Sequence, residues 1–160
     1  MDQASREGGC GCGQVRYRMN GEPLFVHCCH CHWCQRETGT AFGLNAMIEA
    51  DRVDLIQGTP EAVQTPSLSG RGQTIWRCPN CRVAVWSNYG GAGPDIRFVR
   101  VGTLDGPDKL PPDIHIYVAS KQPWVALTDG KPQMEAFYDR REQWPEESQA
   151  RLRALKAAKG

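Results

Sequence analysis

Eight cysteines in a chain of 160 residues constrain this sequence more than any other feature. They stand in three groups: a CxC pair at Cys10 and Cys12, the run CCHCHWC at residues 28–34, and a CPNC pair at Cys78 and Cys81. In an oxidising compartment such a density indicates disulfides, whereas in a reducing one it indicates metal binding or catalysis. The compartment and the spacing of the cysteines therefore decide which chemistry to expect.

The sequence predicts a soluble, cytoplasmic protein. Its first residues, MDQASREGGCGCG, contain no apolar stretch of the kind that a secretory signal needs, and no run approaches the roughly 18 apolar residues of a membrane span. The 19 Lys and Arg residues and 18 Asp and Glu residues leave a net charge of +1, so there is no large positive field to hold a phosphate backbone. We therefore expect neither nucleic acid nor a membrane as a partner, and we interpret the cysteines as metal ligands.

The first predicted metal site combines the CxC and CPNC pairs. The two cysteines of a CxC do not readily form a disulfide with each other, because that bond requires a particular Cα separation and dihedral angle. Four thiolates at about 2.3 Å saturate a tetrahedral Zn²⁺ ion and leave no position for substrate. We therefore expect Cys10, Cys12, Cys78 and Cys81 to hold a structural zinc that links the amino-terminal strand to the middle of the chain. A redox role for Cys78 and Cys81 is the alternative.

The second predicted site uses the CxCxxC motif of Cys29, Cys31 and Cys34. Three protein ligands leave one position open for water, a carbonyl oxygen or a substrate thiolate, which is typical of catalytic zinc. Three thiolates give the zinc core a formal charge of −1, which weakens its acidification of water and favours thiolate exchange or aldehyde polarisation over hydrolysis. His30 or His32 is an alternative fourth ligand that would make this site structural.

Two neighbours of this motif are assigned no ligand role. Cys28 is explained by packing, since free cysteine is commonly buried, and His27 is likewise interpreted as structural. We expect two zinc ions per chain. The second should be held less tightly, because its ligands lie within six residues while those of the first come from two distant segments.

The turn residues predict one β-rich domain over residues 1–160. Its 17 glycines and 11 prolines are spread evenly and separate short runs that favour strands. Residues 9–17, GCGCGQVRY, predict a tight turn that enters a strand, and the further expected strands are 24–26, 46–48, 53–56, 73–77, 83–87, 96–101 and 114–118. Only the end of the chain is predicted to be helical, over about 145–159, because acids follow Pro145 and basic residues fill the last turns.

Four segments together resemble a known family: GCGCGQVRY, CHCHWCQRETGTAFG, RCPNC and VGTLDGPDKLPPDIHIYVASKQPW. In this order they are similar to the glutathione-dependent formaldehyde-activating enzyme (GFA-like) family, which includes centromere protein V. The similarity covers about residues 9–138, with Arg82 standing where the family often has glycine. It implies a fold of several short, coiled antiparallel sheets of the β-tent type. It also implies a structural zinc on the CxC and CPNC pairs and a catalytic zinc on the CxCxxC motif.

The resemblance implies a carbon–sulfur lyase that acts on S-(hydroxymethyl)glutathione, the adduct of glutathione and formaldehyde. Our hypothesis from the residues is a zinc that binds a thiolate or polarises a small aldehyde. Gly39 and Thr40 are candidate substrate contacts, and His115 and Trp124, in segments that resemble the family's, are candidate pocket residues. The alternative function is a non-catalytic binding module in which both zinc sites are structural.

Overall fold

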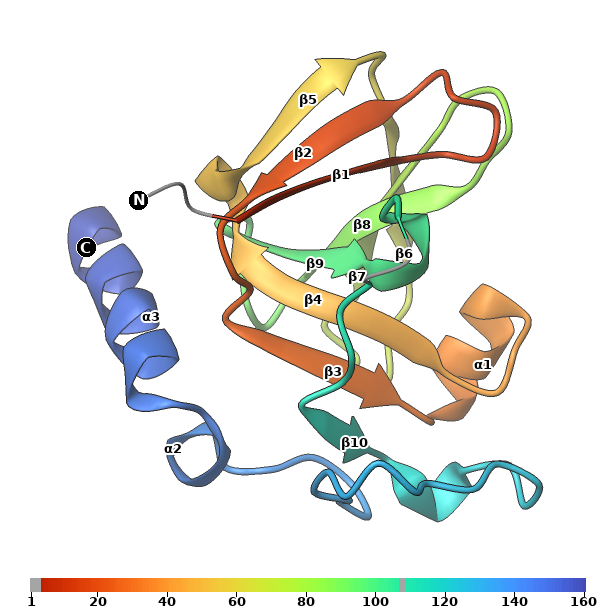
Figure 1. The fold of residues 1–160 in the computed structure, drawn as a ribbon, viewed down its shortest axis with the longest axis vertical. Coiled ribbons are helices and arrows are strands. Elements are labelled where there is room, and N and C mark those ends of the chain that lie inside the picture. The colour runs from red at the N-terminus through yellow and green to blue at the C-terminus, as the bar shows by residue number, and fades with distance from the viewer. Residues whose placement is uncertain (1–3, 107–108) are drawn as a thin grey trace. The chain divides into compact units, whose positions relative to one another are not determined.

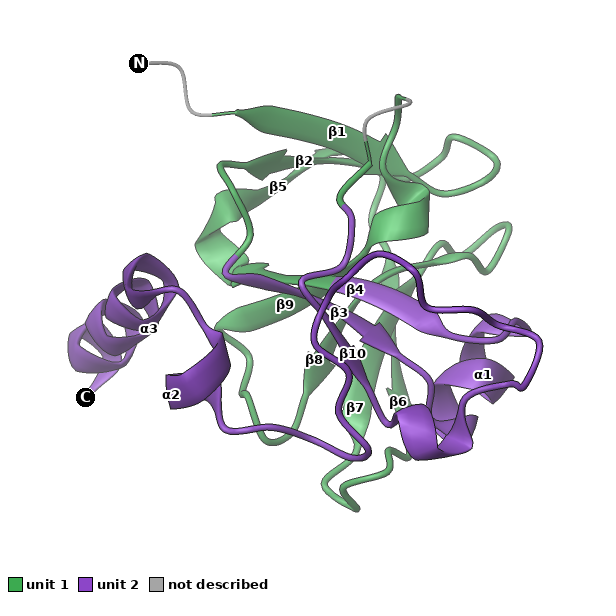
Figure 2. Cartoon of the chain, turned by 60° about the horizontal axis from the view of Figure 1, so that its bottom comes forward, with its two compact units in different colours: residues 1–23, 46–110 green, residues 24–45, 111–160 purple. Residues whose placement is uncertain are grey.

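The computed structural model describes residues 4–106 and 109–160, which form two compact units (Figure 2). Unit 1 comprises residues 1–23 and 46–110, and unit 2 comprises residues 24–45 and 111–160. Strand β4 (Gly43–Glu49) begins in unit 2 and ends in unit 1. This division into two units does not test the prediction of a single domain over residues 1–160, which stays a prediction.

Unit 1 is built from antiparallel strands (Figure 1). Three of them, β1 (Ser5–Gly9), β2 (Arg16–Asn20) and β5 (Val53–Gln57), form a sheet in the order β1-β2-β5. The others lie in the order β9-β8-β7-β6: β6 (Glu61–Thr65), β7 (Gln73–Arg77), β8 (Ala84–Tyr89) and β9 (Ile96–Arg100). Two 3-10 turns, at Ala50–Arg52 and Val101–Thr103, precede β5 and follow β9.

The core of unit 1 is organised around Trp86, which is 2% exposed. The Tyr17 ring meets it edge to face, with the ring centroids 5.6 Å apart, and the guanidinium carbon of Arg97 lies 4.5 Å from the centroid of the Trp86 ring. The Tyr17 hydroxyl lies 2.7 Å from the Thr103 hydroxyl, which gives this buried phenol a hydrogen-bond partner. Aromatic packing thus joins β2, β8 and β9 within the unit.

Unit 2 combines a strand pair with three helices. Strand β3 (Phe25–Cys29) is buried along its whole length and pairs in parallel with β10 (Ile114–Ile116). Helix α1 (His32–Thr38) follows β3, a 3-10 turn at Val118–Ser120 follows β10, and α2 (Arg140–Gln143) and α3 (Glu146–Lys159) end the chain.

Aromatic side chains pack the second unit around Phe25. Trp144 lies 5.7 Å from Phe25 between ring centroids, and its indole N–H donates to the Tyr138 hydroxyl at 2.8 Å. The same hydroxyl lies 2.5 Å from Nε2 of His27, a residue that is 4% exposed. The interpretation of His27 as a structural residue therefore fits its surroundings.

The mainly β fold with a carboxy-terminal helix is confirmed, and the described strands belong to two sheets. Three details differ from the sequence prediction. Strands β1 and β6 were not predicted, and the expectation that only the end of the chain is helical was wrong, since α1 and α2 lie elsewhere. The pairing of β3 with β10 is parallel rather than antiparallel, because these strands are far apart in sequence and no hairpin sets their direction.

Candidate metal centres

The four cysteines of the first predicted site lie together in unit 1. Cys10 and Cys12 stand in the turn after β1, and Cys78 and Cys81 in the turn after β7. Their sulfur atoms all lie within 4.8 Å of one another, at 3.6 Å between Cys10 and Cys12 and 3.7 Å between Cys12 and Cys78. A tetrahedral zinc with Zn–S bonds of about 2.3 Å has sulfur–sulfur edges of about 3.8 Å. The four thiols therefore fit a tetrahedral metal ion.

Backbone N–H groups are directed at these sulfurs. The N–H of Val15 donates to Sγ of Cys10 at 3.3 Å, and the N–H of Asn80 donates to Sγ of Cys78 at 3.4 Å. The pKa of Cys12 is lowered to about 6, first by a hydrogen bond from the Asn80 side chain and then by one from the backbone at Gln14. Donors of this kind favour the thiolate, the form that binds metal.

The turn at Arg82, where the family resemblance favours glycine, is formed. Its φ of 66° is in the left-handed region, where glycine has no steric cost and other residues are uncommon. The backbone N–H of Arg82 donates to the carbonyl of Cys78 at 3.0 Å, and the N–H of Cys78 donates to the carbonyl of Val83 at 3.0 Å. The hydrogen bonds of the turn hold Arg82 in the conformation that glycine adopts more readily.

The second group lies where β3 gives way to α1 in unit 2. The sulfur atoms of Cys29, Cys31 and Cys34 are within 4.8 Å of one another, and their exposed fractions are 7%, 5% and 9%. Neither candidate fourth ligand joins this group in the part of the chain that the structure describes. The ring of His30 lies in another cluster, and His32 is exposed.

Cys31 also begins helix α1. It occupies the N-cap position with extended backbone angles, and its Sγ accepts a hydrogen bond from the N–H of Cys34 at 3.4 Å. Gly39 ends the helix with a φ of 69°. The helix was missed in the sequence because sulfur takes the capping role that Ser, Thr, Asp or Asn usually fills.

The three thiols of the second group polarise one another. Hydrogen bonds from Cys29 and then Cys34 lower the pKa of Cys31, while hydrogen bonds with Cys31 and with Cys34, followed by burial, raise the pKa of Cys29. Burial raises the pKa of Tyr117, and negative charge on these cysteines raises it further. The proton is therefore held more tightly at Cys29 than at Cys31, and Tyr117 lies within the field of this group.

The segment after β10 is joined to helix α1 and to the backbone of His30, beside the second group, by hydrogen bonds that were not predicted. The Gln35 side-chain amide of α1 donates to the carbonyls of His30 at 2.8 Å and Ser120 at 3.0 Å. The Ser120 hydroxyl donates to the His30 carbonyl at 2.9 Å, and the Gln122 amide donates to the Gln35 side chain at 2.8 Å. Residues 117–122 therefore form one side of the surroundings of this group.

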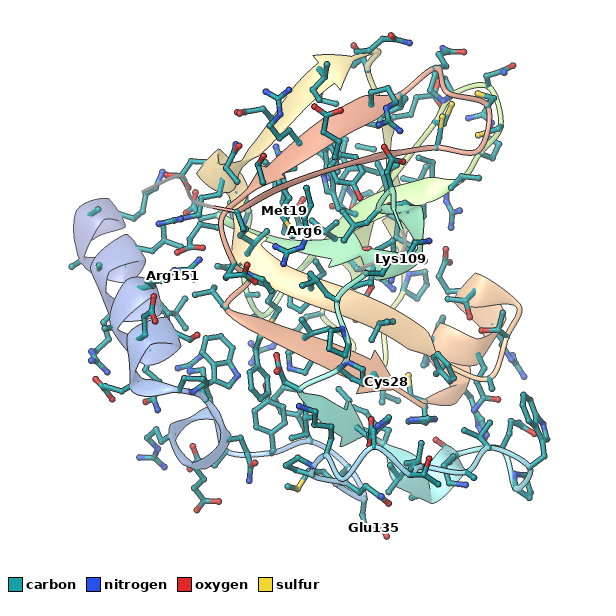
Figure 3. All side chains as sticks on the ribbon, viewed as in Figure 1. Arg6, Met19, Cys28, Lys109, Glu135 and Arg151 are labelled. Carbon is teal, nitrogen blue, oxygen red and sulfur yellow. The ribbon has the colours of Figure 1, made fainter. Side chains whose placement is uncertain are left out.

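A third cluster involves Cys28, His30 and His115, whose ligand atoms are also within 4.8 Å of one another. Cys28, labelled in Figure 3, lies on β3, and His115 lies on the neighbouring β10. Burial lowers the pKa of His30 to about 4 and raises that of the Cys28 thiol to about 12. Without metal, this cluster is therefore neutral at Cys28 and His30.

Comparison with known proteins identifies the family of this chain. The model of the glutathione-dependent formaldehyde-activating enzyme (GFA) family matches residues 5–120, a span that contains all eight cysteines. The chain belongs to the GFA family. A relative in Halomonas elongata, provisionally named a glutathione-dependent formaldehyde-activating enzyme, is 24% identical over 128 residues, covering 76% of this chain and 80% of the relative. A crystal structure of a Rhodobacter sphaeroides protein is 16% identical, with a TM-score of 0.45, covering 80% of this chain and 98% of that chain.

The candidate substrate residues of this GFA chain have different surroundings. Thr40 uses its hydroxyl locally, donating to the Phe42 carbonyl at 3.0 Å, and a Cβ atom at Gly39 would meet no other residue's atom within 4 Å. Trp124 is 76% exposed, so it is not a core residue, and His115 is 5% exposed within the third cluster. Their role toward substrate stays a prediction.

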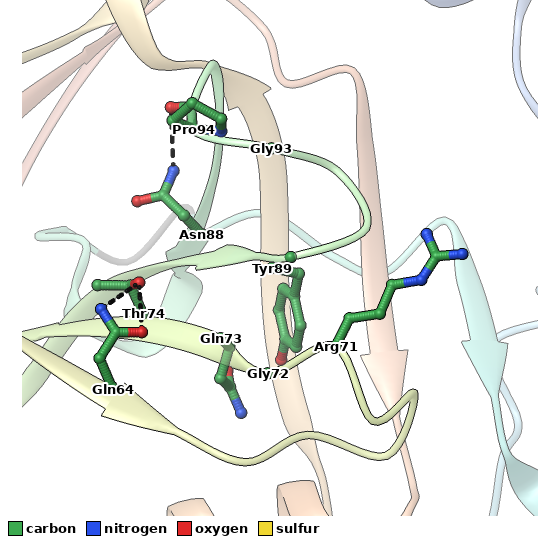
Figure 4. A pocket seen from close by; sticks show the side chains of 10 residues that line it. Gln64, Arg71, Gly72, Gln73, Thr74, Asn88, Tyr89, Gly93 and Pro94 are labelled. Carbon is green, nitrogen blue, oxygen red and sulfur yellow. Dashed lines mark hydrogen bonds between the residues drawn. The ribbon is translucent and has the colours of Figure 1, made fainter.

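A pocket of about 260 Å³ lies elsewhere in this GFA chain, within unit 1 (Figure 4). The residues that line it include Gln64, Arg71, Asn88 and Tyr89. None of the four candidate substrate residues lines it. Within residues 4–106 and 109–160, no helix is both long and apolar enough to cross a membrane.

Proposed function

We propose that this chain is a zinc-dependent enzyme of the carbon–sulfur lyase type that acts on the adduct of a thiol and a small aldehyde. S-(Hydroxymethyl)glutathione, formed from glutathione and formaldehyde, is the substrate that the family name and the Halomonas elongata relative favour. The observation that carries the proposal is the convergence of Cys29, Cys31 and Cys34 with no fourth His, Cys, Asp or Glu ligand in their group among the described residues. Such a set leaves one metal position open.

The three cysteines would hold a zinc ion whose open position supplies Lewis acidity to an aldehyde oxygen or binds a thiolate. Cys31 has two tasks, since its sulfur both binds metal and fixes the first turn of α1. Gln35 and Ser120 keep the segment at 117–122 against the backbone of His30. In the reaction a bond forms between the thiol sulfur and the carbonyl carbon, and the thiol proton ends on the former carbonyl oxygen.

The four-thiol group of Cys10, Cys12, Cys78 and Cys81 would hold the other zinc in a structural role. Its ligands come from turns 66 residues apart in sequence, and four sulfurs leave no open tetrahedral position. We propose that this zinc contributes to the folding of unit 1 and takes no part in the reaction. A cytoplasmic location, where glutathione is abundant and thiols stay reduced, is consistent with eight free cysteines.

The experiment compares the wild type with Cys31→Ser, measuring zinc per chain and the rate of adduct formation from glutathione and formaldehyde above the uncatalysed rate. Serine preserves the helix cap, so the variant removes a thiolate with little change to α1. His32→Asn is the matched control, because His32 is the next residue and is exposed. We expect Cys31→Ser to lose one zinc and at least 100-fold of the enzymatic rate, as removal of essential metal chemistry predicts.

Two results would contradict this proposal. A wild type that holds its zinc tightly, shows no rate above background and is indifferent to added thiol would favour the non-catalytic binding module. Activity in metal-free protein that is lost on substitution of Cys78 or Cys81 alone would instead favour thiol redox chemistry at that pair.

A further inference from the structure

Neither proposed zinc site uses Cys28, although it sits directly before a proposed ligand. Side chains alternate between the two faces of a strand, so Cys28 and Cys29 point to opposite sides of β3. In the parallel pairing of β3 with β10, Cys28 stands in register with His115. The sulfur of Cys28 is therefore turned away from the CxCxxC group and placed beside an imidazole.

Two histidines complete this arrangement with Cys28. Sγ of Cys28 lies 3.5 Å from Nε2 of His30, and that nitrogen lies 3.0 Å from Nδ1 of His115. In a tetrahedral zinc site the sulfur–nitrogen edge is about 3.5 Å and the nitrogen–nitrogen edge about 3.3 Å, from bond lengths of about 2.3 and 2.0 Å. The first distance matches, and the second needs only a small outward movement of one ring.

The surroundings of His115 resemble those of a metal-bound histidine. Its Nε2 lies 2.8 Å from Oδ2 of Asp129, so the ring donates its proton to the carboxylate and keeps the lone pair on Nδ1. That lone pair faces His30 and Cys28. A carboxylate on the far nitrogen is the usual support of a zinc-binding imidazole, because it fixes the tautomer and the orientation of the ring.

Burial separates this cluster from ordinary surface side chains. Cys28 is 3% exposed, His30 is fully buried and His115 is 5% exposed. Nδ1 of His30 is buried without a hydrogen-bond partner among the described residues, so the polar contacts of this ring are made by Nε2, the atom turned to the other two residues. Three metal-ligating atoms thus converge, from Cys28 on β3, from His30 directly after β3, and from His115 on the neighbouring β10.

We propose that Sγ of Cys28, Nε2 of His30 and Nδ1 of His115 form a third metal site, supported by Asp129, that takes zinc or a similar borderline divalent ion. One sulfur and two imidazole nitrogens are a ligand set suited to such ions rather than to calcium or magnesium. The three atoms leave one tetrahedral position for water or a small ligand. The site is independent of the proposed reaction, because its ligands are separate from Cys29, Cys31 and Cys34.

The test counts metal ions per folded chain by native mass spectrometry after reconstitution with excess Zn²⁺, and repeats the count with Co²⁺. We expect three ions in the wild type, two in Cys28→Ser, two in Cys34→Ser and one in the double variant. Saturation of the wild type at two ions would overturn the proposal, as would a third ion retained in Cys28→Ser. Cys34→Ser removes a ligand of the proposed catalytic zinc only. If its loss of one ion adds to the loss in Cys28→Ser, the two ions occupy separate sites.

A second variant covers the case in which Cys28→Ser fails to fold. Asp129→Asn removes the charge that supports His115 and changes no ligand, and the Asp129 side chain is 35% exposed, so the fold should tolerate it. We expect the third ion to bind about 10- to 100-fold more weakly while the first two are unchanged. Glu135→Gln is the control, because it removes one exposed carboxylate of the same unit (Figure 3). Equal affinity for the third ion in Asp129→Asn and Glu135→Gln would contradict the supporting role of Asp129 and with it the site as proposed.

Discussion

Sγ of Cys31 accepts a hydrogen bond from the backbone N–H of Cys34 at 3.4 Å, so one proposed zinc ligand caps the helix that carries another. Formation of α1 and assembly of the thiol group are therefore coupled. The sulfur that a metal would bind is already positioned by the first turn of the helix, which reduces the ordering that metal binding must accomplish. This double role leads to the first prediction.

Replacing Cys31 by serine or by alanine should separate metal binding from helix capping. Both variants lose a thiolate of the second group and should lose the same zinc. Only serine can accept the hydrogen bond from the N–H of Cys34, and loss of an N-cap costs about 1 kcal/mol. We expect the free energy of unfolding in urea to be about 1 kcal/mol higher for Cys31→Ser than for Cys31→Ala. Equal stability would show that a hydrogen-bond acceptor at position 31 does not stabilise α1.

Loss of the metal ion from the four-thiol group should destabilise the protein more than loss of the ion from the group of Cys29, Cys31 and Cys34. Cys12 and Cys78 are 66 residues apart, so a metal between them closes a long loop, whereas the second group closes only short ones. We expect Cys78→Ser to lower the melting temperature by about 10 °C or more and Cys34→Ser to lower it by less. Differential scanning calorimetry of the zinc-loaded variants measures both. A larger effect of Cys34→Ser would refute this ranking.

Arg82 should be replaceable by glycine with a gain in stability. Its φ of 66° costs about 1 kcal/mol for a residue with a Cβ atom, and glycine removes that cost. The side chain also forms an exposed ion pair with Glu61, which contributes little. Arg82→Ala is the control, because it removes the ion pair but keeps the Cβ atom. We expect the free energy of unfolding of Arg82→Gly to exceed that of Arg82→Ala by about 1 kcal/mol, and the reverse order would contradict strain at this turn.

Alkaline pH should destabilise the protein through Tyr17. Burial raises its pKa from 10.0 to about 12 in the folded protein, so the folded state holds the phenolic proton that the unfolded state loses. The free energy of unfolding that this difference in pKa contributes is fully present below pH 10 and is lost as the pH rises from about 10 to 12. Tyr17→Phe removes it, although it also loses the hydrogen bond to Thr103.

The measurement is urea unfolding of both proteins across this pH range. Between pH 10 and pH 12, the free energy of unfolding of the wild type should fall by about 2 kcal/mol more than that of Tyr17→Phe, because the pKa differs by about two units between the folded and unfolded states. Other tyrosines and lysines also titrate there, but they are common to the two proteins. Parallel losses would mean that Tyr17 does not titrate differently in the folded state.

The spacing of the cysteines was sufficient to predict two sulfur groups, because each motif is local and its members cannot lie far apart. CxC, CxCxxC and CxxC each place their sulfurs within one turn of the chain, and joining Cys10 and Cys12 with Cys78 and Cys81 needed only the rule that four thiolates saturate zinc. Glycines and prolines likewise predicted the approximate position of most strands, although not of β1 and β6. These features depend on short-range geometry, which the order of residues specifies directly.

The third cluster was decided by tertiary structure alone. His30 and His115 are 85 residues apart and share no motif, and they meet only because β10 pairs with β3 in a register that sets His115 beside Cys28. A shift of one residue would turn His115 to the opposite face of the strand pair. Residue order determined which ligands this protein carries, whereas the register of two distant strands decided which of them converge, because that register depends on packing along the whole length of both strands.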